Sequence, residues 1–300
     1  MTAIPHTEIG PENGGNFEYG WTDHYLQAHI ISDVGRKRSY NEDSCVLCAP
    51  EDKVLAKERG IMVAIADGMG GASAGERASR LSLSVLIEDY YSDVAGSIPM
   101  RLNRAVARAN SRIYAEGEEN PEYHGMGTTL SSLTITGDCA YIAHVGDSRV
   151  YISRSDQLVQ ITEDHSLVAE QVRSGIISEE EARTHSLKNL ITRAVGIKED
   201  VDADLLCLHI QRDDLFLICS DGLNNMVEDD EIADSLHAST LQGIARVLVG
   251  KALESGGSDN ISVAILRVIQ SPPKSELHVG CEEIEPFDDS LFNKLKNLMK

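Results

Sequence analysis

Five aspartates in this 300-residue chain stand where an apolar or strand-like stretch meets a polar or glycine-rich turn. They are Asp43 in RSYNED (38–43), Asp67 in AIADGMGG (64–71), Asp147 in HVGDSR (144–149), Asp221 in CSDGL (219–223) and Asp259 in GGSDN (256–260). Carboxylate oxygens are the ligands that Mg²⁺ and Mn²⁺ prefer. Converging carboxylates can hold two such ions about 3.5–4 Å apart, and a water between the ions becomes a nucleophile at neutral pH. A single Asp-Gly pair is as compatible with an ordinary turn, but five such aspartates together with Arg38 favour a two-metal site.

The elements that must position these residues follow from the apolar patterns. The patterns predict strands at 26–34, 44–48, 60–66, 130–136, 139–145, 149–153, 204–210, 215–219 and 261–268. They predict helices at 75–94, 98–118, 166–174, 178–184, 228–236 and 241–254. Gly137-Asp138 predicts a hairpin turn, and Ser178 with Glu181 predicts a capping box. Blocks of strands and helices in this order indicate an antiparallel α+β architecture.

The five motifs together resemble the type 2C metal-dependent protein phosphatases (the PPM family), of the bacterial serine/threonine type. RSYNED (38–43), ADGMGG (66–71), HVGDSRVY (144–151), CSDGL (219–223) and GGSDNIS (256–262) occur in that family's order and at its separations. The resemblance covers about residues 27–269. It implies a four-layer αββα fold, a β-sandwich of two antiparallel sheets flanked by helices, with the metals at one end.

The resemblance also implies a catalytic set. Asp43 and Asp67 would bind two Mn²⁺ or Mg²⁺ ions, with Asp67 bridging them, and Gly68 would contribute its backbone carbonyl. Asp221 and Asp259 would complete the paired site. The expected reaction is hydrolysis of phosphoserine and phosphothreonine by direct attack of a metal-bridging hydroxide, without a covalent enzyme intermediate.

Four further residues acquire expected roles from the same motifs. Asp147, alongside Asp221, would hold a third and weaker ion. Arg38 would grip the substrate phosphate, because a guanidinium presents a planar fork to phosphate oxygens. Glu42 and Asn260 would orient metal-bound waters. Many eukaryotic members have a histidine where this chain has Met69, and methionine cannot donate a proton. A water on the third metal near Asp147 is the alternative proton source.

The catalytic domain is expected at residues 26–270. Two segments are expected outside it, and a third, the flap, is expected within it. Residues 1–25 are interpreted as an N-terminal extension or a lead-in to a first strand. Residues 161–196 resemble the flap of bacterial members, either a substrate contact or a solvated helical hairpin. Residues 271–300 form an acidic tail that ends in an amphipathic helix over 290–300. That helix would either dock on its own domain or bind a partner.

Other chemistry-bearing residues have plainer interpretations. Cys45 and Cys48 lack the second pair that a zinc site needs, and three residues apart on a strand they point to opposite faces, so core packing is expected. Six cysteines are ordinary usage, not a disulfide framework, which favours a reducing cytoplasmic setting. His144 and His165 are expected to have hydrogen-bonded structural roles in preference to catalytic ones.

The net charge of the chain restricts the classes of partner that we expect. A formal net charge of −21 argues against nucleic acid and anionic lipid, and we expect no membrane association. Phosphorylated proteins, with a cognate serine/threonine kinase as the opposing enzyme, are the expected partners of a monomer.

Three alternatives to the expected function stay open. They are a pseudophosphatase that only binds partners, a partner-switch stress-response phosphatase, and a two-metal phosphodiesterase or nuclease that the acidic surface opposes.

Overall fold

The computed structural model describes residues 6–93, 95–270 and 280–286, and within them the strands form two sheets. Sheet 1 contains, in spatial order, β1 (His6–Gly10), β4 (Asp43–Ala49), β5 (Ile61–Met69), β7 (Leu130–Thr136), β8 (Cys139–Val145), β11 (Asp204–His209) and β14 (Glu282–Glu283), with β6 (Gly127–Thr128) paired to β5. Sheet 2 contains β10 (Gln157–Gln160), β9 (Arg149–Arg154), β12 (Leu215–Cys219), β13 (Ile261–Val268), β3 (Leu26–Asp33) and β2 (Phe17–Thr22). Neighbouring strands are antiparallel except β11 and β14, which are parallel.

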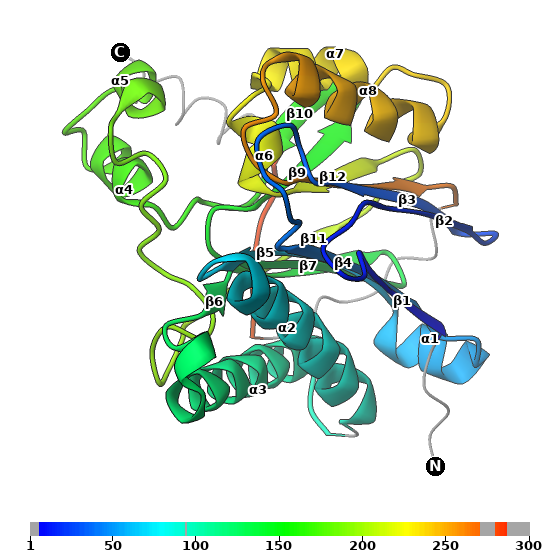
Figure 1. Cartoon of the computed structure of the whole chain (residues 1–300). Coiled ribbons are helices and arrows are strands. Elements are labelled where there is room, and N and C mark those ends of the chain that lie inside the picture. Colours follow the sequence, from blue (N-terminus) through cyan, green and yellow to red (C-terminus); the bar gives the residue numbers. More distant parts are fainter. Residues whose placement is uncertain (1–5, 94, 271–279, 287–300) are drawn as a thin grey trace.

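Helices cover the outer faces of both sheets (Figure 1). The helices of the described residues are α1 (Lys53–Arg59), α2 (Ala72–Ser92), α3 (Ile98–Glu119), α4 (Leu167–Arg173), α5 (Glu179–Thr184), α6 (Asp221–Asn224), α7 (Asp229–Ser235) and α8 (Leu241–Glu254), with one 3-10 turn at Pro121–Tyr123. The long helices α2 and α3 lie on sheet 1, whereas α7 and α8 lie on sheet 2. Helices α4 and α5 project sideways, away from both sheets.

Alternation along the strands builds three apolar layers. In β5, Val63 and Ile65 face the layer between the two sheets, while Met62 and Ala64 face α2 and α3. Successive side chains of a strand point to opposite faces, so a strand buried on both faces is apolar throughout. A third cluster packs sheet 2 against α7 and α8. The expected αββα sandwich is therefore confirmed, and β7, β8, β12, β13 and α8 have their predicted bounds.

The N-terminal segment differs from the expected extension. Residues 6–22 supply β1, the edge strand of sheet 1 beside β4, and β2, the edge strand of sheet 2 beside β3. The sheets therefore begin before residue 26. The sequence did not predict α1, α6 or β10 either, because elements of four to seven residues give too little periodicity.

The cysteines divide into one bonded pair and four buried thiols. Cys207 of β11 is disulfide-bonded to Cys281, 74 residues later, beside β14. The cysteine usage did not predict this bond, because a chain pattern cannot show which distant residues the fold brings together. Cys45 and Cys48 lie in different apolar layers, which confirms their predicted core role. The amphipathic helix predicted over 290–300 lies outside the described residues.

No helix within the described residues is both long and apolar enough to cross a membrane.

Candidate metal centre

Asp43 and Asp67 face each other across two neighbouring strands of sheet 1. Asp43 is the first residue of β4 and stands opposite Asp67 in the register with β5. Only 1% of Asp43 is exposed. The hydroxyls of Ser220 and Ser262 donate to its Oδ2 at 2.8 and 2.6 Å, whereas no described group forms a hydrogen bond with its buried Oδ1. One carboxylate oxygen is thus fixed by sheet 2 and the other is left for a ligand.

Sheet 2 brings two more aspartates to the same end of the sandwich. Asp221 begins α6 directly after β12, and Asp259 precedes β13 in the adjacent loop. Burial raises the pKa of Asp43 to about 7, with the charges of Asp221 and Asp259 adding to the shift against the two serine hydrogen bonds. Burial and the charge of Asp259 raise the pKa of Asp221 to about 6, although a hydrogen bond from Asp67 partly offsets the rise.

Asp67 stands at the centre of this charge cluster. Burial, followed by the charges of Asp43, Asp221, Asp147 and Asp259, raises its pKa well above the ordinary value. Two hydrogen bonds to Thr129 fix its backbone. The Asp67 N–H donates to the Thr129 hydroxyl and the Asp67 carbonyl accepts from the Thr129 N–H, each at 2.9 Å. The carboxyl is therefore held among like charges, an arrangement that a bound cation would stabilise.

Asp147 joins the cluster from the turn after β8. Gly146 makes that turn with a φ of 115°, which favours glycine. Asp147 is buried, and no described group forms a hydrogen bond with its Oδ1. Burial and the charge of Asp221 raise its pKa well above the ordinary value.

The donor set fits Mn²⁺ or Mg²⁺. Two buried carboxylate oxygens without partners and several carboxyls that raise one another's pKa values are the signature of a hard-cation site. Gly68 belongs to this arrangement, since a Cβ there would lie 2.1 Å from the Gly75 carbonyl oxygen and 2.6 Å from that of Glu42. Only glycine permits that approach.

Arg38 lies at the rim of the cluster. Its guanidinium donates to Oδ2 of Asp259 at 2.9 Å and lies 3.8 Å from Oε1 of Glu42. With 46% of its side chain exposed, Arg38 remains open to an anion from solvent. The neighbouring Glu42 is nearly buried, and burial raises the pKa of its carboxyl despite the charge of Arg38.

Asn260 has different partners from those expected of a water-orienting residue. Its amide NH₂ donates to the carbonyls of Val34 and Tyr40, both at 2.9 Å, and its Oδ1 accepts from the Glu42 N–H at 2.8 Å. Asn260 therefore fastens the loop that carries Arg38. Its amide does not face the cluster as a free group.

The two histidines beside the motifs are held by the protein. His144 contacts the Ser131 hydroxyl through Nδ1 and the Glu163 carbonyl through Nε2. Burial lowers its pKa to about 4. His165 accepts the Gly146 N–H at Nδ1, so its Nε2 carries the proton that it donates to Asp204. These partners agree with the structural roles expected for both residues.

Sequence reasoning missed the supports of the cluster. Ser220 and Ser262 stand beside Asp221 and Asp259 in the recognised motifs, so their position was a usable signal. Lys188 gave none: it lies in the flap between α5 and β11, yet its charge lowers the pKa of Asp221. The flap thus brings a cation toward the carboxylates.

A sandwich of two sheets between helical layers, with carboxylates and an arginine gathered at one end, defines a metal-dependent phosphatase. The family model for Protein phosphatase 2C matches residues 29–261. The chain belongs to this family of serine/threonine protein phosphatases.

Bacterial relatives cover most of the chain. It is 37% identical to the serine/threonine phosphatase stp of Listeria innocua, over 80% of this chain and 95% of that protein. It is 38% identical to the serine/threonine protein phosphatase PstP of Mycobacterium tuberculosis, over 79% of this chain and 44% of PstP. The crystal structure of the PstP catalytic domain in complex with two manganese ions is similar at a TM-score of 0.72 and 36% identity, covering 82% of this chain and 99% of that one.

Proposed function

We propose that the cluster formed by Asp43, Asp67, Asp221 and Asp259 is the catalytic centre and that it hydrolyses phosphoserine and phosphothreonine in proteins. The observation that carries this proposal is the bare, buried Oδ1 of Asp43 opposite Asp67, with Arg38 at the rim. These carboxylates, together with the Gly68 carbonyl, would hold two Mn²⁺ or Mg²⁺ ions. When bound, such ions supply an acidified water as nucleophile and neutralise charge on the phosphate.

The residues of the chain would divide the remaining work. Ser220 and Ser262 hold Oδ2 of Asp43, so the carboxylate keeps one orientation while Oδ1 serves as the ligand atom. Arg38 would bind the non-bridging phosphate oxygens through the donors that Asp259 leaves free, and preorganised donors of this kind stabilise the transition state. Asp147, whose Oδ1 is bare and buried, would hold the third ion.

The flap would contact the substrate. Its two ends are fastened to the catalytic end by Thr128 pairing with Val195 and by the His165 N–H donating to the Gly146 carbonyl. Between them it exposes three apolar side chains, those of Ile176, Leu187 and Leu190. Apolar groups exposed on a flap whose ends reach the catalytic end would suit a polypeptide substrate better than a small phosphate ester.

The wider setting is part of the same proposal. A kinase that phosphorylates serine and threonine would supply the substrates, and the phosphatase would act as a monomer in the cytoplasm. Light scattering after size exclusion tests the monomer. Trapping of thiols in intact cells tests the compartment, because a reducing cytoplasm would leave Cys207 and Cys281 unbonded.

The function is tested by phosphate release from a phosphothreonine peptide. We expect release with Mn²⁺, none with EDTA, and a large loss for Asp221→Asn with Mn²⁺ present. Asp230→Asn on the exposed surface of α7 is the matched control and should retain activity. Folded wild-type protein that binds Mn²⁺ but releases no phosphate would contradict the proposal and favour the pseudophosphatase.

A further inference from the structure

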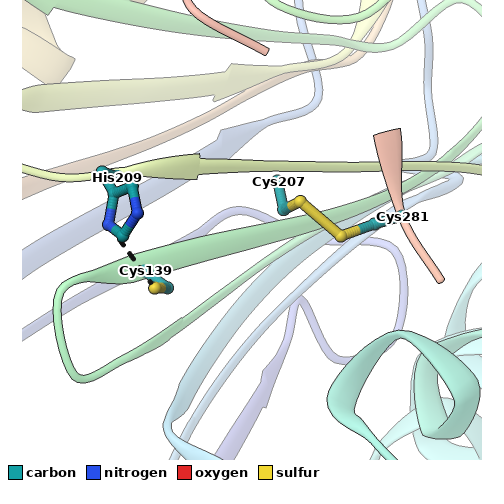
Figure 2. The surroundings of a disulfide bond; sticks show 4 residues. All are labelled: Cys139, Cys207, His209 and Cys281. Atoms are coloured by element: carbon teal, nitrogen blue, oxygen red, sulfur yellow. Dashed lines mark hydrogen bonds between the residues drawn. A yellow bond between two sulfur atoms is a disulfide. The ribbon is translucent and has the colours of Figure 1, made fainter. Parts of the chain in front are cut away.

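A second group of metal-ligating side chains lies at the end of sheet 1 opposite the carboxylate cluster. Asp138 is in the turn between β7 and β8, Cys139 is the first residue of β8, and His209 is the last residue of β11. Cys139 and His209 are register partners, and Figure 2 shows the two side chains meeting across the strands. Asp147 follows the other end of β8, so this group is separate from the catalytic centre.

The ligand atoms of the three side chains have the spacing of a metal site. Cys139 Sγ lies 3.5 Å from Oδ1 of Asp138 and 3.8 Å from Nδ1 of His209, and that nitrogen lies 3.2 Å from Oδ2 of Asp138. Zinc bond lengths of about 2.0–2.3 Å in tetrahedral geometry place ligand atoms about 3.3–3.6 Å apart. The thiol and the imidazole stand at nearly those separations from the carboxylate, each from a different oxygen of Asp138, and one ligand atom from each residue lies within 4.8 Å of the other two.

The backbone holds this arrangement in place. The Ile210 N–H donates to the Asp138 carbonyl at 2.8 Å, which locks the hairpin turn to the end of β11. Arg154 donates to the His209 carbonyl, so its positive charge lies near the site. Both oxygens of Asp214 accept hydrogen bonds from its guanidinium, and this carboxylate offsets the repulsion that Arg154 would exert on a cation. Asp138 and Cys139 are buried, whereas 40% of the His209 side chain is exposed. An ion could therefore enter from the His209 side.

We propose that Asp138, Cys139 and His209 form a binding site for a zinc-like divalent transition metal. A thiolate and an imidazole select borderline-soft ions such as Zn²⁺ over Mg²⁺ and Mn²⁺, which prefer the all-oxygen catalytic centre. Asp138 and His209 alone would be explained by an ordinary ion pair. The thiol of Cys139 lies beside both groups, and this third ligand type is what points to a metal site. The site would clamp the β7–β8 hairpin to β11.

Cobalt(II) gives a direct test, because only a site with a thiolate ligand produces a near-ultraviolet sulfur-to-cobalt charge-transfer band. The full chain is stripped with EDTA, kept without reductant so that Cys207 and Cys281 stay bonded, and titrated with Co²⁺. We expect the band in wild type, its loss in Cys139→Ser, and its retention in Cys48→Ser, which removes another buried thiol. Asp221→Asn should keep the band, since the catalytic carboxylates contribute no sulfur.

A second variant keeps the test decisive if Cys139→Ser does not fold. His209→Ala, at a partly exposed side chain, should weaken the Co²⁺ and Zn²⁺ affinity of the sulfur site at least about tenfold. His237→Ala, at an exposed histidine of the surface, should not. Absence of the band in wild type, an undiminished band in Cys139→Ser, or an unchanged Co²⁺ affinity in His209→Ala would overturn the proposal.

Discussion

Asp43 shows how one residue becomes a cation ligand. Two serine hydroxyls from the opposite sheet bind one of its oxygens, and the interior leaves the other oxygen bare. A buried carboxylate without a counter-charge is costly, and here the cost appears as a pKa raised by burial to about 7. The residue is thus stable either with a proton or with a metal ion.

This pKa predicts an inverted pH dependence for the metal-free protein. The pKa of Asp43 rises from 3.8 in the unfolded chain to about 7 in the folded protein. Its contribution to stability is therefore full below about pH 4 and is lost as the pH rises through about 7. In EDTA, thermal unfolding should occur at lower temperature at about pH 8 than at about pH 5, because the contribution of Asp43 falls by roughly 3 kcal/mol between these two pH values.

Asp43→Asn is the matching variant, because asparagine cannot lose a proton. Its metal-free form should show a flatter pH profile and exceed wild type in stability at about pH 8. Mn²⁺ should stabilise wild type more at high pH than at low pH, since metal binding releases protons. Parallel pH profiles for the two proteins in EDTA would contradict this account.

Asp147 carries a prediction about the leaving group. Met69 cannot supply the proton that a serine or threonine alkoxide needs, whereas p-nitrophenolate leaves without one. If protonation depends on Asp147, Asp147→Asn should lower kcat for a phosphothreonine peptide by about 10²–10⁴ and for p-nitrophenyl phosphate far less. Steady-state kinetics on both substrates measure the contrast. Equal losses on both would assign Asp147 to metal binding alone.

At the scale of elements, strand ends and loops fix the chemistry. The β4–β5 register places Asp43 opposite Asp67, while β12 and β13 deliver the serines that reach across from sheet 2. Asn260 fastens the Arg38 loop by three hydrogen bonds. The arginine therefore keeps its position relative to the carboxylates, although its own side chain is half exposed.

The flap belongs to this scale too. The charge of Lys188 lowers the pKa of Asp221, so this lysine would also attract an incoming phosphate. We expect Lys188→Ala to raise KM for a phosphothreonine peptide several-fold with a smaller change in kcat, because the cation would bind substrate and transition state alike. Lys198→Ala, at an exposed lysine beyond the flap, is the control. An unchanged KM would remove Lys188 from substrate binding.

Much of the element pattern could be predicted from the sequence. Strands such as β7, β8 and β13 are bounded by turn residues, and the Gly137-Asp138 turn joins β7 to β8 as expected. The five aspartates could be found because each adjoins a distinctive turn. Pairings between distant segments could not be predicted: nothing local joins β1 to β4, Cys207 to Cys281, or Lys188 to Asp221. Such long-range relations depend on the whole fold, whereas the periodicity of apolar residues reports only on local structure.

At the scale of the whole molecule, a few long connections complete the sandwich. The N-terminal residues close one edge of each sheet, and the short strand β14 lies beside β11 at another. The disulfide joins residues 74 positions apart and so constrains the unfolded chain more than the folded one.

The disulfide makes a stability prediction. Cys281→Ser should lower the free energy of unfolding by about 2–4 kcal/mol, because it restores loop entropy to the unfolded chain. Chemical denaturation without reductant measures the loss, and addition of a thiol reductant should bring wild type to the same value. Cys207→Ser should match Cys281→Ser. A Cys281→Ser protein as stable as wild type would show that the bond contributes nothing to folding.

The narrow strand β14 also has a consequence for association. On the edge of β11 away from β8, Glu282 and Glu283 are the described residues that pair with it, and the Ile284 N–H donates to the Cys207 carbonyl. An open strand edge is a template on which another chain can add, and charged residues laid along it discourage that addition. The two glutamates therefore protect this edge of β11 against pairing with another chain. A chain that ended before Gly280 would lose that protection, and we expect it to associate more readily with other copies through the exposed edge of β11.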